Sequence, residues 1–139
     1  DLTVTGVQTC ALPISKNFWQ MPQGGIDKNE NFFTAALREL KEETSIVSVK
    51  LIKEIDDKFT YILPDHLIGI IWKGKFKGQI QKWFIMRFVG NKLEINIKTK
   101  HPEFLDWKWI DLKDLTKIAV NFKLEVYKQV KSEVLKILN

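Results

Sequence analysis

Apolar positions at helical spacing predict two main helices in this chain. The first begins at residue 32 and ends near residue 43, and Asn31 stands before it as an N-cap. Its apolar residues are Phe33, Ala36, Leu37 and Leu40. The second covers residues 123–138, and its apolar stripe consists of Leu124, Tyr127, Val130, Val134 and Leu138. We expect this stripe to dock on a core rather than on a membrane or a partner.

Shorter apolar stretches between and before these helices predict strands. Strand character is found at residues 18–21, 48–55, 58–63, 82–90, 93–97 and 103–112. In residues 58–63, Phe59, Tyr61 and Leu63 alternate onto one face. Strands mixed with two helices predict an α/β or α+β fold with a mixed sheet.

Polar and glycine-containing segments separate these elements. Pro22 and the Gly24–Gly25 pair predict a tight loop after the first strand, and the lysine- and glycine-rich residues 73–81 predict a turn. Asp111 and Asp114 stand where they would cap a short helix. We assign Trp83, Trp107 and Trp109 to the core, because paired aromatic residues on a strand usually pack.

Size and composition indicate one globular domain. The chain has 139 residues, of which 45% are hydrophobic and 28% charged. Its net charge of +5 fits a polyanionic ligand, although a lysine-rich composition also arises from codon bias. The single Cys10 excludes an internal disulfide framework and a cysteine zinc site. No apolar run approaches the roughly 20 residues that span a bilayer, so we expect a soluble, cytoplasmic protein without a membrane partner.

The first fifteen residues differ in character from the rest. Residues 4–14, "VTGVQTCALPI", look like the in-frame translation of a common sequencing-library adapter, and no charged n-region or long apolar stretch marks them as a secretory signal. The alternative is a native strand, because "LTVTGVQ" has a two-residue period. We favour a non-native segment at residues 1–15 and a native domain at residues 16–139.

The segment "RELKEETS" crowds three carboxylates onto the first helix. Glu39, Glu42 and Glu43 stand at i, i+3 and i+4 and therefore converge on one face, where like charges repel. A hard divalent cation such as Mg²⁺ or Mn²⁺ prefers such oxygen ligands and would offset the repulsion. The alternative is a solvated charged face with Arg38 and Lys41 as partners.

The residues around this cluster resemble the Nudix box. That motif spans 23 positions here, and its members are Gly24, Glu30, Arg38, Glu39, Leu40, Glu42, Glu43, Ser45 and Ile46. Ser45 stands where the family has glycine, which suits a left-handed helix exit. Serine in that geometry costs on the order of 1 kcal/mol of backbone strain, and it affects the loop rather than the metal ligands.

The resemblance implies a role for each residue of the box. Glu39, Glu42 and Glu43 would bind Mg²⁺ or Mn²⁺ together with a carbonyl oxygen of Gly24. Arg38 would orient Glu30 or another carboxylate through a bidentate contact. One glutamate of the box, or a carboxylate from elsewhere, would take the proton of an attacking water.

The resemblance extends from residue 18 to the C-terminus and is strongest to the RNA pyrophosphohydrolase branch of the family, also called (di)nucleoside polyphosphate hydrolases. It rests on "WQMPQGGI", "GQIQKWF", "PEFLDWKWIDL" and "VNFKLEVY". By position, Glu103 matches a further metal ligand, Gln79 and Lys82 match residues near the substrate phosphates, and Phe122 and Lys123 match residues that hold RNA bases. For Phe122, core packing is an equal alternative. The implied fold is an α/β/α sandwich around a mixed sheet, with the native N-terminal strands missing.

The expected activity is Mg²⁺-dependent removal of pyrophosphate from 5′-triphosphorylated RNA. The first alternative is hydrolysis of dinucleoside polyphosphates, which present the same P–O–P group. The second is a non-catalytic Nudix-fold module that binds nucleotides or RNA, and the third is a basic RNA-binding domain. The expected partner is the RNA 5′ end or a dinucleoside polyphosphate, and a monomer is favoured. The identity of the general base, the number of metal ions and the activity of the chain as written stay open.

Overall fold

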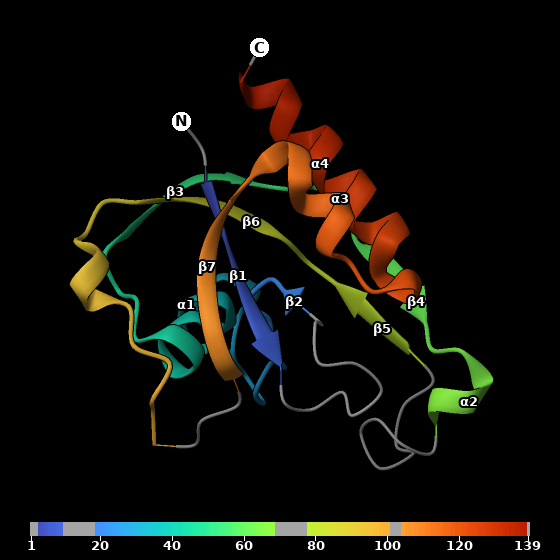
Figure 1. Ribbon diagram of the computed structural model, residues 1–139, viewed down its shortest axis with the longest axis horizontal. Helices are drawn as coiled ribbons and strands as arrows, with labels where there is room; N and C mark the ends of the chain where they lie inside the picture. Colours follow the sequence, from blue (N-terminus) through green and yellow to red (C-terminus); the bar gives the residue numbers. More distant parts are fainter. Residues whose placement is uncertain (1–2, 10–18, 69–77, 101–103, 139) are drawn as a thin grey trace.

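The computed structural model describes residues 3–9, 19–68, 78–100 and 104–138. In this part of the chain, α1 (Phe32–Thr44) lies at the lower left of Figure 1 and α3 (Leu115–Ile118) and α4 (Leu124–Leu138) at the upper right. Strands run between them. The α/β character predicted from the sequence is therefore confirmed.

The described strands form three small sheets, and every pairing among them is antiparallel. The first sheet has the order β2 (Trp19–Gln20), β1 (Thr3–Thr9), β7 (Phe104–Asp111). The second pairs β3 (Val49–Glu54) with β6 (Phe84–Phe88), and the third pairs β4 (Phe59–Ile62) with β5 (Gly78–Gln81). The mixed sheet that we expected is not seen among the described residues, because no parallel pair occurs there.

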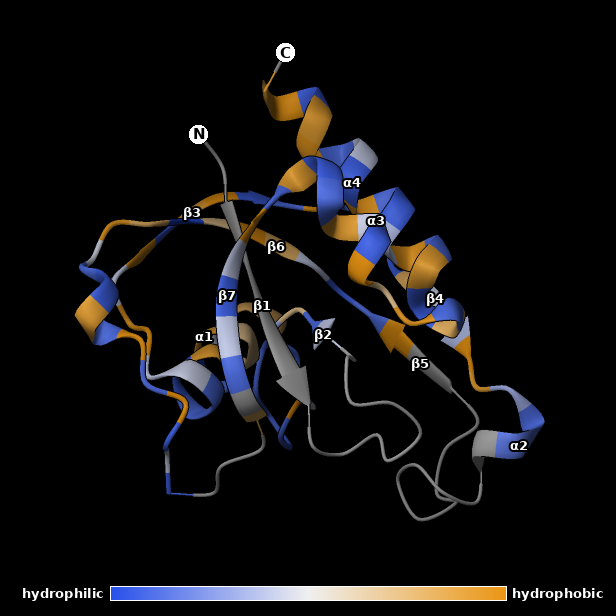
Figure 2. Ribbon diagram, in the orientation of Figure 1, coloured by the Kyte–Doolittle hydropathy of each residue, from blue (hydrophilic) through white to orange (hydrophobic). Residues whose placement is uncertain are grey.

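Both main helices form where their periodicity predicts. The Asn31 side chain accepts a hydrogen bond from the backbone N–H of Thr34 at 2.8 Å, so it caps α1 as expected. The α4 stripe is buried at Tyr127, Val130 and Val134, whereas Leu138 at the helix end is 50% exposed. Figure 2 shows apolar and polar residues alternating along α4. No helix in the described part is long and apolar enough to cross a membrane.

The core lies between α4, β4, β6 and the end of β7. Its buried residues are Met21, Ile55, Phe59, Tyr61, Ile85, Ile110, Leu112, Leu115, Val126, Tyr127, Val130 and Val134. The predicted alternation of Phe59, Tyr61 and Leu63 is confirmed, since all three are buried. Trp83 packs against this core, and the half-buried Trp107 and Trp109 contact each other edge to face at 6.4 Å.

Three local predictions were wrong. Residues 78–81 form β5 rather than part of a turn, while residues 73–77 lie outside the described part. Residues 93–97 are not a strand, because the 3₁₀ turn η2 (Lys92–Glu94) occupies their start. Asp111 and Asp114 precede η3 (Leu112–Asp114) and α3, but neither side chain makes a capping hydrogen bond.

The N-terminal segment forms a strand in the first sheet. β1 pairs with β7 from Thr3↔Asp111 to Thr9↔Phe104, and with β2 at Val7 and Gln8. Strand formation agrees with the alternative that we considered for this segment. It does not decide the origin of residues 1–15, because a two-residue period pairs with a strand edge whatever its source.

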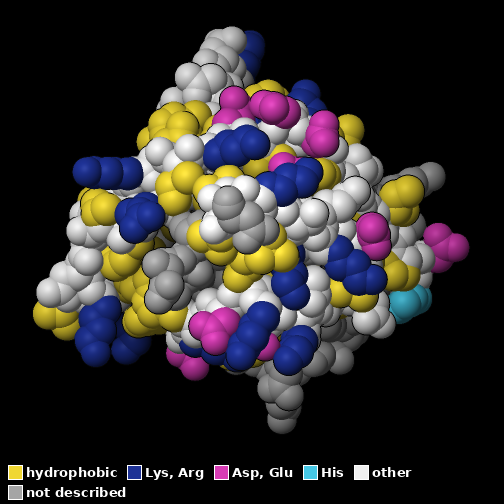
Figure 3. Space-filling view, turned by 90° about the horizontal axis from the view of Figure 1, so that it is seen from above, with side chains coloured by type: hydrophobic (Ala, Val, Ile, Leu, Met, Phe, Trp, Pro, Cys, Tyr) yellow, Lys and Arg dark blue, Asp and Glu magenta, His cyan; other side chains and the backbone are white. Residues whose placement is uncertain are grey.

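Positive charge is distributed over the surface. Figure 3 shows Lys and Arg side chains spread between hydrophobic ones on the face that it presents. Two further short elements, α2 (Asp65–Ile68) and η4 (Asn121–Lys123), complete the described structure. Lys123 at the end of η4 is buried.

Candidate active site

The site is built where the loop after β2 runs along α1. Gly24 in this loop faces the Glu39 carboxylate so closely that a Cβ at position 24 would overlap it. At Gly25, by contrast, a Cβ would meet no atom within 4 Å. Glycine at position 24 therefore lets the loop backbone approach this carboxylate, and a side chain there would have to displace Glu39.

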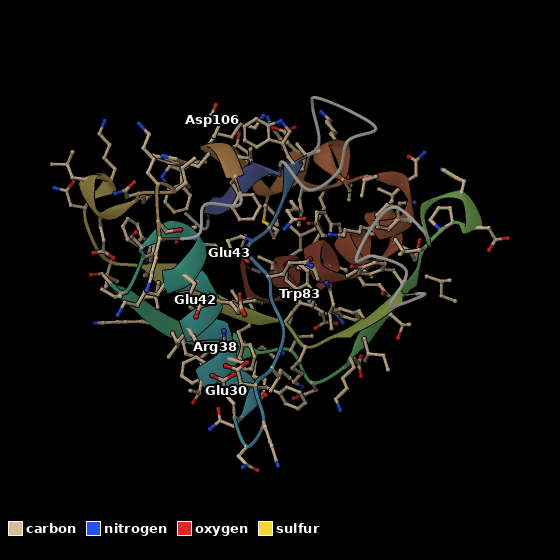
Figure 4. The ribbon with its side chains drawn as sticks, turned by 90° about the horizontal axis from the view of Figure 1, so that it is seen from below. Glu30, Arg38, Glu42, Glu43, Trp83 and Asp106 are labelled. Atoms are coloured by element: carbon tan, nitrogen blue, oxygen red, sulfur yellow. The ribbon has the colours of Figure 1, made fainter. Side chains whose placement is uncertain are left out.

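Arg38 organises the acidic residues around the loop (Figure 4). Its Nε and Nη2 donate to the two carboxylate oxygens of Glu30, both at 2.8 Å, and Nη2 also donates to the Gly25 carbonyl at 2.7 Å. The expected bidentate contact is therefore present. Hydrogen bonds from Arg38 lower the pKa of Glu30 to about 2, and the same bonds raise the pKa of Arg38.

Two of the three helix glutamates share the remaining nitrogen of Arg38. Nη1 lies 2.7 Å from Glu39 Oε1 and 3.1 Å from Glu42 Oε2. The Glu39 side chain is mostly covered, whereas that of Glu42 is 57% exposed. The arginine thus offsets the repulsion between the two carboxylates.

Glu43 lies apart from Arg38, at the buried end of the cluster. It is 5% exposed, and its Oε2 accepts a hydrogen bond from the backbone N–H of Gln23 at 3.2 Å. In Figure 4, Arg38, Glu42 and Glu43 follow one another along α1, and Glu30 lies beside Arg38 in the loop that precedes the helix. Glu43 therefore links α1 to the loop on the inner side of the site.

A buried polar cluster that the sequence analysis did not identify lies behind Glu43. Gln23 Oε1 accepts hydrogen bonds from Gln81 Nε2 at 3.0 Å and from Lys123 Nζ at 3.2 Å. Gln23 also hydrogen-bonds to the Tyr61 hydroxyl, whose pKa burial raises. Burial lowers the pKa of Lys123 to about 8, and the nearby Glu43 acts in the opposite direction. A sequence feature that could have predicted this cluster is the presence of four glutamines in otherwise apolar segments: Gln20, Gln23, Gln79 and Gln81.

The predicted substrate-contacting residues have different environments. Lys82 donates to the Asp56 carbonyl at 2.8 Å, with Glu54 at 3.8 Å. The Phe122 ring contacts the Tyr61 ring, with centroids 5.6 Å apart, and packs against the core. Gln79 lies in β5 opposite Tyr61, but its side chain, like all of Glu103, is outside the described structure.

The donor set fits a hard divalent cation, but it is not preassembled. Carboxylates of Glu39, Glu42 and Glu43 and the loop backbone at Gly24 supply the oxygen atoms that such an ion prefers. Among the described residues, however, no three His, Cys, Asp or Glu side chains form a metal-holding group as they stand.

A cavity of about 720 Å³ opens beside the cluster. Near the site it is lined by the loop residues 21–26 and by Glu39, Gln81 and Lys82. Deeper inside, it is lined by apolar side chains of α1, β6 and α4, including Leu40, Ile85, Met86, Val130 and Val134. The cavity therefore offers space for a ligand beside Glu39 and Lys82.

Comparison with known proteins identifies relatives across most of the chain. Residues 8–130 match the NUDIX domain family. The RNA pyrophosphohydrolase of Pelagibacter ubique (strain HTCC1062) is 66% identical over 124 residues, covering 89% of this chain and 78% of that protein. The RNA pyrophosphohydrolase of Wolbachia pipientis wMel is 46% identical over 125 residues, covering 89% of this chain and 77% of that protein.

Solved structures show the same fold at lower identity. The binary complex of a C. elegans Ap4A hydrolase has a TM-score of 0.65 and 20% identity, covering 96% of this chain and 88% of that chain. The E. coli dihydroneopterin triphosphate pyrophosphohydrolase has a TM-score of 0.64 and 22% identity, covering 91% and 84%. At these identities the likeness concerns the fold alone.

Proposed function

This chain belongs to the NUDIX family, and we propose that it is a hydrolase that removes pyrophosphate from the 5′ end of triphosphorylated RNA. The observation that carries this proposal is the 66% identity with an RNA pyrophosphohydrolase over 89% of the chain. The contacts of Gly24, Glu30 and Arg38 support it, because they hold the acidic helix against the loop. Because RNA 5′ ends are processed in the cytoplasm, we also propose that the protein is cytoplasmic.

We assign the metal site to Glu39, Glu42 and Glu43, with a carbonyl oxygen of Gly24 and with Glu103. A bound Mg²⁺ or Mn²⁺ would neutralise charge on the phosphate chain and activate a water. Arg38 keeps Glu30 fixed through two bonds at 2.8 Å, so the loop and the helix stay together when Glu39 and Glu42 are drawn to a cation. Glu42, the most exposed of the three, is our choice for the group that accepts the proton of the water.

We assign the substrate side to Gln79, Lys82 and Phe122. Lys82 lines the cavity beside Glu39, so its ammonium group can reach a phosphate by releasing the Asp56 carbonyl. The Phe122 ring would stack on a base, at roughly 1–3 kcal/mol per base. Lys123, the remaining residue of the predicted set, is buried.

The decisive experiment measures pyrophosphate released from triphosphorylated RNA with Mg²⁺ or Mn²⁺. We expect Glu42→Gln and Glu43→Gln to abolish turnover, while Glu125→Gln, an exposed charge on α4, leaves it unchanged. Equal turnover in all three variants, or turnover unaffected by a metal chelator, would contradict the assignment. Diadenosine tetraphosphate assayed in parallel tests the alternative substrate, since its P–O–P group is the same.

We also propose that residues 1–15 are not native to this domain. The support is the sequence of residues 4–14, which looks like a translated adapter and lacks the lysine-rich character of the remainder of the chain.

A further inference from the structure

Lys123 is a buried lysine directly behind the acidic helix. It ends η4, is 4% exposed, and places its Nζ 3.3 Å from Gln20 Oε1 and 3.2 Å from Gln23 Oε1. The same ammonium lies 5.5 Å from the centre of the Tyr61 ring. Its surroundings are therefore protein groups on several sides, and little of its surface faces solvent.

Gln23 connects this lysine to the carboxylates. Its side-chain oxygen accepts from Lys123, while its backbone N–H donates to Glu43 Oε2 at 3.2 Å. The next residue, Gly24, lies against the Glu39 carboxylate. A displacement of Gln23 would thus shift the partner of Glu43 and the neighbour of Glu39 together.

The far side of Gln23 is anchored to the β4–β5 sheet. Gln81 Nε2 donates to Gln23 Oε1 at 3.0 Å, and Gln81 Oε1 accepts from Trp83 Nε1 at 3.0 Å. Because the Gln23 oxygen has two acceptor positions, Gln81 and Lys123 together occupy both. Lys123, Gln81 and the Tyr61 hydroxyl therefore all help to fix the Gln23 amide.

We infer that Lys123 is a positioning residue, which orients Glu43 through Gln23, rather than a group that binds the substrate. A contact with an RNA base or phosphate needs an exposed donor, whereas the donors of this lysine point to Gln20 and Gln23 inside the protein. A substitution of Lys123 that removes its charge or shortens its side chain would therefore change the position of the Glu43 carboxylate and leave RNA binding unaffected. The inference rests on the proposed function, since it assumes that Glu43 holds the metal.

Lys123→Met tests the inference, because methionine fills a similar volume without the ammonium group. We expect Mn²⁺ affinity, measured by calorimetry without RNA, to fall 10–100-fold, as when other outer partners of metal ligands are removed. Turnover should fall with it, while KM for triphosphorylated RNA stays within about twofold. Lys131→Met is the matched control on α4, since that lysine only donates to the Lys113 carbonyl at the surface.

The opposite pattern would overturn the inference: a raised KM with Mn²⁺ affinity and turnover unchanged would make Lys123 a substrate contact. If Lys123→Met does not fold, Gln23→Met breaks the same connection and should weaken Mn²⁺ binding similarly. Where both fold, the double variant should be no worse than the single ones, because both act on one connection. Additive losses would count against the inference.

Absence of pyrophosphate release in the unaltered chain would instead reject the proposed function, and the Mn²⁺ titration would still test Lys123.

Discussion

Gly24 and the Glu39 carboxylate meet so closely that an added methyl group at position 24 would displace the Glu39 side chain. We predict that Gly24→Ala lowers kcat/KM for triphosphorylated RNA 10–100-fold, because its Cβ would overlap the carboxylate and displace it. Gly25→Ala is the matched control, since a Cβ there has open space and should cost far less. Equal losses in the two variants would show that the close approach has no role.

Ser45 allows a second test at the scale of one residue. It ends α1 with φ 68°, in the left-handed region that glycine favours, and its Oγ donates to the Asn96 carbonyl at 2.8 Å. Ser45→Gly and Ser45→Ala both lose the hydroxyl, but only alanine keeps the backbone strain. We predict from urea unfolding that the glycine variant is about 1 kcal/mol more stable than the alanine variant. Equal stabilities would mean that the strain is relieved elsewhere.

Single residues also show what the sequence revealed of the site. The contact of Arg38 with Glu30 followed from the motif, because both partners belong to one short segment. The role of Gln23 did not, because its partners Gln81 and Lys123 lie 58 and 100 residues away. The segment "MPQGG" alone does not indicate which residues the Gln23 side chain contacts in the folded protein.

The same difference between local and distant partners explains the errors at the scale of elements. Residues 93–97 alternate like a strand, but the Asn91 side chain accepts from the Leu93 N–H at 2.9 Å and begins a 3₁₀ turn. β5 was missed because its only large apolar residue, Ile80, is 72% exposed and its pairing depends on β4. Helix α1 was predicted correctly because its cap and its periodicity are both local.

Glu94 in η2 accepts hydrogen bonds from the residues just before β3, and the stability that these bonds provide depends on pH. The Glu94 carboxylate accepts from the backbone N–H of Val47 and from both the N–H and the hydroxyl of Ser48, at 2.6–2.9 Å. These bonds lower its pKa, so folding gains stability above the ordinary pKa of glutamate and loses it as the pH falls below that value.

We predict that Glu94→Gln makes the free energy of unfolding less dependent on pH between pH 6 and 3. The measurement is the urea midpoint at both pH values, with Glu125→Gln as an exposed control. A variant that loses as much stability on acidification as the unaltered chain would contradict this account of Glu94.

At the scale of the whole molecule, the N-terminal segment supplies β1, the central strand of the first sheet. We predict that replacing residues 1–15 with the native upstream segment raises the melting temperature and the turnover, because the strand at this position pairs with both β2 and β7. Differential scanning calorimetry and the pyrophosphate assay on both chains check this. Unchanged values would show that residues 1–15 already supply what the fold needs.

The 100 residues between Gln23 and Lys123 have a consequence for synthesis on the ribosome. At about 5–20 residues per second, the loop and the acidic helix emerge roughly 5–20 seconds before the lysine that supports them. During that interval the nascent chain carries its carboxylates without their inner support. An interrupted translation product that ends before residue 123 would therefore lack this support.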